Sequence, residues 1–343
     1  MQYFGEFISI SVAVSWTFTA LFFEFAGKRI GSLSVNLLRL FFAFFLLGTM
    51  LYFTTGSFLP AGADTKTWIW MSLSGVVGFV FGDLCLFYSY ILITARFSQL
   101  LMTLAPPFAA LFGWMLLGEK LSPMGFLGMS VTLLGIAISI LKRGSANGGK
   151  ANSGDTLVAG TSNLTVVACC EKEKTSFLKK ITPNVSLHLP LKGVLLGIGG
   201  ALGQGLGIVL SKQGMNHYSV AAAGSEVASY IPFAATQMRI ITGAIGFALI
   251  ILLTKRVGVL REGIKDKRAM GAIFMGAIFG PFIGVSLSLM AVQYTNTAVA
   301  STIMATTPII ILIPYVLFYK RKVTFIEVLG AILSVGGVSL FFL

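Results

Sequence analysis

Ten runs of mostly apolar residues, separated by short polar breaks, account for nearly all of the chain. They cover residues 7–27, 33–53, 67–92, 97–117, 123–141, 192–212, 233–253, 269–292, 298–318 and 324–343. Because a membrane-spanning helix needs about 20 mostly apolar residues, each run predicts one such helix. Only 11% of the residues are charged, against about 25% in a typical soluble domain, and the mean hydropathy is +0.88. The sequence therefore predicts an all-α membrane protein and excludes a soluble enzyme, a nucleic-acid-binding domain and a disordered chain.

A long polar segment divides the ten runs into two sets of five. Residues 142–191 are rich in Gly, Ser and Asn and have no helical period, which is typical of a flexible linker. We expect three parts: a first half at 1–141, the linker at 142–191 and a second half at 192–343. A second irregular connection is expected at 216–234, which contains Glu226 and Pro232 and is long enough to hold a short interfacial helix.

The net charge of +13 reflects basic residues in short loops, where they set orientation in the membrane. Most of them fall on the side of the membrane that holds the linker. This bias predicts a cytoplasmic linker and both termini outside. The three cysteines have no metal-ligand spacing and the two histidines lie in or near loops, so no metal or cofactor is expected.

The two halves repeat each other. When the sequence is shifted by 202 residues, 71–141 falls on 273–343 without a gap, and the matched residues include glycines and prolines with backbone-specific roles. Examples are Gly78 on Gly280, Gly82 on Gly284, Pro106 on Pro308 and Gly135 on Gly337; at a shift of 200, Arg39 falls on Arg239. Because each half has an odd number of spans, the second half enters the membrane from the opposite side. We therefore predict two inverted five-helix repeats, an architecture common among secondary transporters.

Several motifs resemble the EamA family of the drug/metabolite transporter superfamily. They are Leu104-Ala105-Pro106, Leu117-Gly118-Glu119-Lys120-Leu121-Ser122, Gly128 and Gly135, with Thr307-Pro308, Gly330 and Gly336-Gly337 in the second half. Arg39 and Arg239 match the arginine common in the second helix of each repeat. The resemblance implies two five-helix bundles around a central cavity and transport of a small polar solute, amino-acid-like or similar, by alternating access, often as export. It also implies cytoplasmic termini, and here we give the charge bias more weight.

Asp83 is the most centrally placed acidic residue, in the middle of the run 67–92. A charge at this depth costs about 2.5–3.5 kcal/mol on insertion scales, so it needs a cavity or a partner. We interpret Asp83 as a cavity carboxylate for a cationic group or a coupling proton; a structural ion pair is the alternative. Glu24, four residues before Lys28, fits a surface ion pair as well as a role in transport.

Uncharged polar residues on the helices that the resemblance assigns to the cavity complete the predicted solute site, since such cavities combine aromatic surface with a few polar groups. They are Trp16, Tyr88, Tyr90, Gln99, Thr103, Gln204, Thr302 and Thr306.

A second set of residues is expected to have structural or gating roles. Prolines bend helices and free carbonyl groups, and small residues let helices approach closely in lipid. Lys212 is expected to be an interfacial anchor. The structural or gating set is Arg39, Arg239, Pro106, Pro308, Gly82 and Gly284.

The sequence favours a secondary transporter, as a monomer or homodimer, in a bacterial inner membrane. No intramembrane Ser-His-Asp set, phosphate loop or ATPase domain is visible, so we do not expect an enzyme. Two alternatives stay open. One is a nucleotide-sugar or sugar-phosphate transporter of the same superfamily, which would need several cavity Lys or Arg residues. The other is a membrane enzyme or scaffold that transports nothing.

Overall fold

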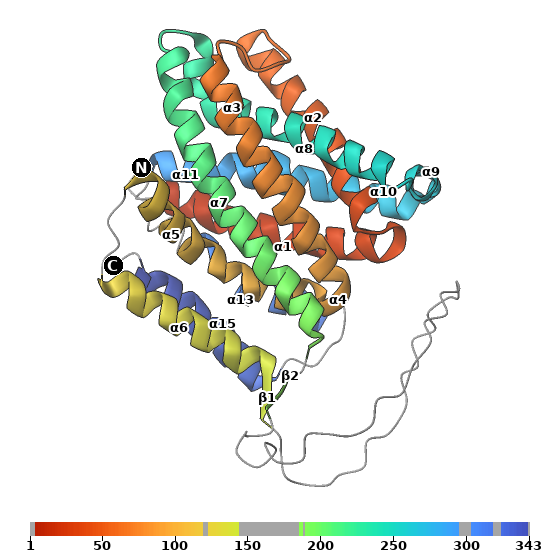
Figure 1. Ribbon diagram of the computed structural model, residues 1–343, viewed down its shortest axis with the longest axis vertical. Helices are drawn as coiled ribbons and strands as arrows, with labels where there is room; N and C mark the ends of the chain where they lie inside the picture. The colour runs from red at the N-terminus through yellow and green to blue at the C-terminus, as the bar shows by residue number, and fades with distance from the viewer. Residues whose placement is uncertain are drawn as a thin grey trace, which may run out of the picture.

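A computed structural model describes residues 4–118, 123–143, 185–187, 189–294, 303–317 and 324–341, and this part of the chain is helical apart from one short pair of strands (Figure 1). The first half contains α1 (Phe4–Ile30), α2 (Ser32–Thr55), α3 (Thr65–Ser74), η1 (Gly75–Asp83), α4 (Leu84–Leu101), η2 (Met102–Leu104), α5 (Ala105–Leu117) and α6 (Pro123–Ile140). The strands are β1 (Leu141–Arg143) and β2 (Val185–Leu187). The second half contains α7 (Leu191–Ala221), η3 (Glu226–Tyr230), α8 (Ile231–Leu253), α9 (Val257–Lys265), α10 (Lys267–Ala277), η4 (Ile278–Gly284), α11 (Val285–Tyr294), α13 (Thr307–Ile310), α14 (Leu312–Leu317) and α15 (Phe325–Phe341).

Six helical runs in the described residues are long and apolar enough to cross a membrane, and three shorter apolar helices accompany them. One of the six extends from Thr65 to Leu116 and is 52 residues long. It is interrupted at Thr94, whose φ of 70° is not helical. This interruption falls between the predicted runs 67–92 and 97–117.

Two regions predicted to be irregular contain some regular structure, and in the region 216–234 a short helix was expected. The helix α7 continues through residues 216–221, and the 3₁₀ helix η3 follows it before α8 begins. The ends of the predicted linker pair as the antiparallel strands β1 and β2, with Leu141 opposite Leu187. Residues 144–184 and 188, the rest of that linker, lie outside the described residues.

The two halves also share an unusual backbone conformation at equivalent positions. The helices η1 and η4 are π-helical, and a shift of 202 residues places η4 inside η1. Each contains a Gly-xxx-Gly pair, Gly78 and Gly82 in η1 and Gly280 and Gly284 in η4. Segments of π-helix are rare and often occur at functional sites, so the two segments direct attention to the middle of the molecule.

The last helix of each half packs against the other in an antiparallel arrangement (Figure 1). A Cβ atom at Gly135 would lie 2.5 Å from the backbone N of Ser334, and one at Gly337 would lie 2.4 Å from that of Thr132. These contacts correspond at a shift of 202 residues in both directions: Gly135 with Gly337, and Thr132 with Ser334. The α6–α15 contact therefore has approximate two-fold symmetry.

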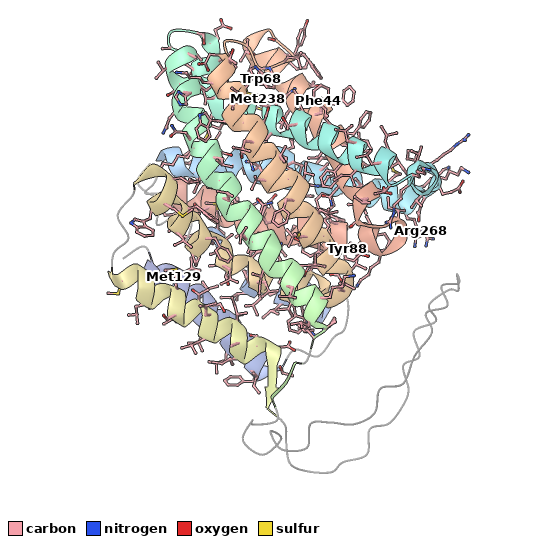
Figure 2. All side chains as sticks on the ribbon, viewed as in Figure 1. Phe44, Trp68, Tyr88, Met129, Met238 and Arg268 are labelled. Atoms are coloured by element: carbon pink, nitrogen blue, oxygen red, sulfur yellow. The ribbon has the colours of Figure 1, made fainter. Side chains whose placement is uncertain are left out.

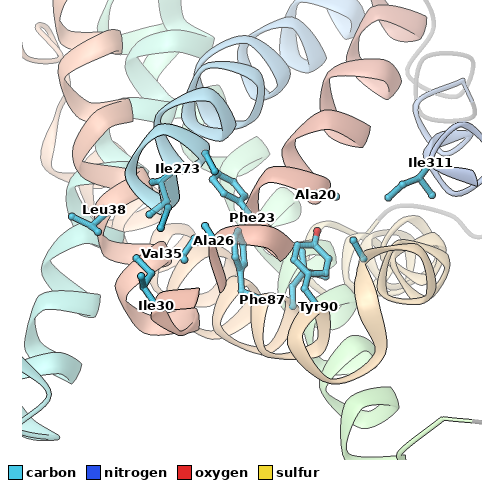
Figure 3. Close-up of a cluster of buried hydrophobic side chains, with 14 of the residues drawn as sticks. Ala20, Phe23, Ala26, Ile30, Val35, Leu38, Phe87, Tyr90, Ile273 and Ile311 are labelled. Atoms are coloured by element: carbon cyan, nitrogen blue, oxygen red, sulfur yellow. The ribbon is translucent and has the colours of Figure 1, made fainter. Parts of the chain in front are cut away.

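The hydrophobic core consists mainly of two large clusters. One joins α1 and α2 to α4, α10 and α14 and includes Phe23, Phe87 and Ile273 (Figure 3). The other lies mainly between α2 and α8 and includes the buried Met238, and Phe44 and Trp68 pack against this cluster (Figure 2). Both clusters contain residues from both halves, and Arg39 contacts aromatic rings of both.

Candidate functional site

Asp83, at the end of η1, forms a buried ion pair with Arg39 of α2. The two residues are only 4% and 5% exposed. Arg39 Nε also donates to Asn36 Oδ1 at 3.0 Å, and its guanidinium carbon lies 4.7 Å from the centre of the Phe87 ring. Asp83 is thus centrally buried, as the sequence indicates, and it has a partner within its own repeat.

Gln204 brings the second half of the chain to the same carboxylate. Its Nε2 donates to Asp83 Oδ1 at 2.6 Å and lies 3.3 Å from the carbonyl oxygen of Gly78. This contact requires a close approach of α7 and η1. A Cβ atom at Gly203 would lie 2.6 Å from Gly82 Cα, so glycine is needed where the helices cross. The packing role of Gly82 follows directly from this geometry.

Trp16 occupies the matching position in the other half. A Cβ atom at Gly284 would lie 2.8 Å from the indole Nε1 of Trp16, and Ser15 Oγ donates to the carbonyl oxygen of Phe279 at 2.6 Å. The helix α1 therefore packs on η4 as α7 packs on η1. Trp16 and Gln204 hold equivalent places in the two crossings.

Arg239 of α8 is the repeat partner of Arg39, but its surroundings differ. It is 6% exposed, and its guanidinium carbon lies 4.6 Å from the centre of the Phe79 ring. Its Nη2 lies 2.9 Å from the position that a Cβ atom at Gly78 would take. Its Nε is buried and has no hydrogen-bond partner among the described residues.

Tyr90 and Gln99, both on α4, form a second polar pair near Asp83. Tyr90 is 3% exposed, and its hydroxyl accepts a hydrogen bond of 2.8 Å from Gln99 Nε2. Asp83, Phe87 and Tyr90 follow at helical spacing and lie on one face. Tyr88 lies on another face, is 40% exposed and contacts Lys192, so the structure does not bring it to this cluster.

The predicted threonines bond to their own backbone. Thr103 Oγ1 donates to the carbonyl oxygen of Leu100 at 2.7 Å, and Thr306 Oγ1 to that of Ile303 at 2.6 Å. Thr302 lies outside the described residues. Pro106 and Pro308 each stand in the first turn of a new helical segment, where proline leaves no hydrogen bond unmade.

Glu24 is more deeply buried than the expected surface pair with Lys28 requires. The ion pair with Lys28 is present, but Glu24 is 1% exposed. Its carboxylate also accepts from the Ala95 backbone N at 2.9 Å and from the Tyr315 hydroxyl. The sequence does not indicate these contacts, because Tyr315 lies in the other half of the chain.

A neighbouring ion pair continues this contact between the halves. Arg96 Nη1 lies 3.1 Å from Glu327 Oε2, and the Arg96 guanidinium carbon lies 5.7 Å from the centre of the Tyr315 ring. Ser139 Oγ, just before β1 in the chain, donates to the carbonyl oxygen of Glu327 at 3.4 Å. These polar contacts therefore tie the two halves together at the end of the bundle that carries the strands.

An apolar cavity of about 370 Å³ lies beside the bundle core, between α2 and the second half. It contains none of the predicted solute-binding residues. Its lining consists of Phe42, Phe45, Leu46, Thr49, Met50, Phe53, Phe274 and Phe282.

Comparison with known proteins identifies a family and a fold. Residues 3–141 and 191–343 match the EamA-like transporter family in two repeats. A solved structure described as "Crystal structure of protein" is similar over 99% of this chain and 96% of that chain, with a TM-score of 0.55 and 14% sequence identity. No curated protein sequence matches the chain.

Proposed function

Since the chain belongs to the EamA-like transporter family, we propose that it moves a small polar metabolite, amino-acid-like or similar, across the membrane by alternating access, and that it works as an exporter.

 The family is a transporter family, and the protein is an integral, multi-pass membrane protein. The observation that carries the proposal is the buried cluster of Arg39, Asp83 and Gln204. This cluster joins the first repeat to the second at the crossing of α7 and η1. Burying a charged group in a membrane is costly, so such groups are rare and typically mark the pathway of a solute or an ion.

We further propose ten spans in two inverted repeats, placed in a bacterial inner membrane. The interruption at Thr94 supports two spans within the run Thr65–Leu116, and the three shorter apolar helices supply the remaining ones. The antiparallel α6–α15 contact supports the inversion, because repeats of the same orientation would place their last helices parallel.

The experiment that tests the proposed function is flux in proteoliposomes containing the purified full chain, measured with a panel of amino acids and other small polar metabolites. Substrate-dependent flux supports a transporter. Absence of flux in either direction for every solute of the panel would contradict the proposed transporter function. It would favour the alternatives of a membrane enzyme or a scaffold.

Replacement of Asp83 by Asn tests the proposed role of its charge. The variant keeps the size of the side chain but removes the negative charge beside Arg39 and replaces one of the two acceptor oxygens by a donor. We expect flux to fall by roughly 10- to 100-fold, which corresponds to a charged hydrogen bond of about 1.5–3 kcal/mol, or its pH dependence to shift. Wild-type flux at every pH, from protein that inserts normally, would rule out the role.

Orientation is tested with the native cysteines. The chain has three, and Cys85→Ser leaves only Cys169 and Cys170, both in the 142–191 linker. If the linker is cytoplasmic, as the charge bias predicts, an impermeant thiol reagent labels this variant in lysed cells and not in intact ones. The control is Lys66→Cys, at an exposed position on the opposite side, in a chain lacking the native cysteines. Labelling of the linker from outside would establish the reverse orientation.

A further inference from the structure

The described residues include four buried charged side chains, and their partners differ. They are Glu24, Arg39, Asp83 and Arg239. Glu24 pairs with Lys28, and Arg39 pairs with Asp83. Arg239 makes no ion pair within the described part of the chain, and its Nε has no hydrogen-bond partner there. One positive charge is thus left without a counter-charge of its own at the centre of the molecule.

The internal repeat shows what Arg239 lacks. Arg39 has two anchors: Asn36, which accepts from its Nε, and Asp83. At the shifts that align the helices, Asn36 corresponds to Thr236 and Asp83 corresponds to Val285. Thr236 Oγ1 donates to the carbonyl oxygen of Pro232 at 2.8 Å, and it does not accept from Arg239 Nε, which has no hydrogen-bond partner among the described residues. Both anchors of the arginine are therefore missing in the second half.

We propose that Arg239 binds a carboxylate of the transported solute, which takes the place that Asp83 has beside Arg39. This inference rests on the proposed function and names the solute class. A planar guanidinium matches a carboxylate in a bidentate arrangement. A single carboxylate also balances the single unpaired positive charge, whereas a phosphate dianion would need further cationic groups.

The surroundings of Arg239 fit such a role. The absence of a side chain at Gly78 leaves the guanidinium directly against the backbone of η1, close to the crossing with α7. Phe79 covers part of it, 4.6 Å from the guanidinium carbon, and the same ring lies 5.6 Å from that of Arg39. In this conformation the site is sealed, and a solute reaches it only when the helices around the crossing separate, as alternating access requires.

The test compares acids with their uncharged amides in counterflow into proteoliposomes. The probe pairs are alanine and alaninamide, phenylalanine and phenylalaninamide, and lactate and lactamide. We expect the wild type to carry at least one acid and to carry its amide roughly 10- to 100-fold more slowly, because the amide lacks the charge that the guanidinium binds. Arg239→Gln should reduce flux of that acid by a similar factor.

Two further variants distinguish binding from a structural role. Arg239→Gln should leave the Tm of the solute-free protein unchanged or raised, since it removes an unpaired buried charge. Val285→Asp should raise the Tm and lower the flux, since it supplies the missing internal carboxylate. Arg261→Gln, at an exposed arginine of α9, is the matched control and should change neither quantity.

The outcomes separate the inference from the proposed function. Flux of amides or other uncharged solutes that equals flux of the acids, unchanged acid flux in Arg239→Gln, or a Tm that falls together with flux would each overturn the role of Arg239 while leaving a transporter. A wild type that carries no solute at all would overturn the proposed function and this inference with it.

Discussion

Replacing Asp83 by Leu is expected to lower the free energy of unfolding by about 3–5 kcal/mol, because it leaves Arg39 buried without its counter-charge. Both side chains are only 6% exposed, so water cannot replace the lost partner. Adding Arg39→Met to this variant should restore most of the stability, since a buried ion pair can often be exchanged for apolar side chains at little cost. Thermal unfolding of the purified protein in detergent measures both effects.

The exposed pair Arg29–Asp266 provides the matched control. Its side chains are 40% and 23% exposed, and the hydrogen bond from Arg29 lowers the pKa of Asp266. Asp266→Asn keeps a residue able to cap α10 and should cost less than about 1 kcal/mol, as for other surface pairs. A double variant of Asp83 and Arg39 as unstable as Asp83→Leu alone would show that the pair is not the reason for the loss.

Sequence reasoning located most of the helices because their signal is local. An apolar run long enough to span a membrane is visible in any window, and the observed helix ends mostly lie within a few residues of the predicted ones. The interruption at Thr94 carries no such signal. A positive φ usually falls on Gly or Asn, and here it falls on a β-branched residue.

Sequence reasoning could single out polar residues of the buried cluster but not their pairings. Asp83 and Gln204 were singled out because polar groups in a membrane need partners, and they are indeed bonded to each other. The contact of Glu24 with Tyr315 joins residues 291 positions apart, and no pattern within one helix can indicate it. Tyr88 could have been set aside by helical spacing, since Asp83, Phe87 and Tyr90 define another face of the same helix.

The repeat gives information that neither half contains alone. The matched glycines Gly82 and Gly284 were expected to allow close helix packing, and both lie at helix crossings; Gly135 and Gly337 make close contacts that were not predicted. The differences between the halves are as informative as the matches. Val285 in place of Asp83 is unremarkable in the sequence, and its consequence emerges only when the ion pair of the first half is known.

Replacing Gly337 by Leu should separate α6 from α15 and lower the free energy of unfolding by about 3 kcal/mol or more, at the upper end of overpacking costs. Even a Cβ atom there would lie 2.4 Å from the backbone N of Thr132 and 2.7 Å from the carbonyl oxygen of Gly128, and backbone cannot move aside as a flexible side chain can. By the approximate two-fold symmetry, Gly135→Leu should cost a similar amount, with 2.5 Å to the backbone N of Ser334.

The neighbouring residue supplies the control for this prediction. A Cβ atom at Gly336 would meet nothing within 4 Å, so Gly336→Leu adds the same side chain to the same helix without reaching α6. It should leave stability unchanged or raise it by up to about 1 kcal/mol, because glycine is a poor helix former. Thermal unfolding in detergent compares the three variants. Equal losses for Gly336→Leu and Gly337→Leu would show that bulk on α15 destabilises the protein by some route other than the α6–α15 contact. A loss confined to Gly135→Leu and Gly337→Leu would establish that the two halves are held together by the symmetric close approach of their last helices.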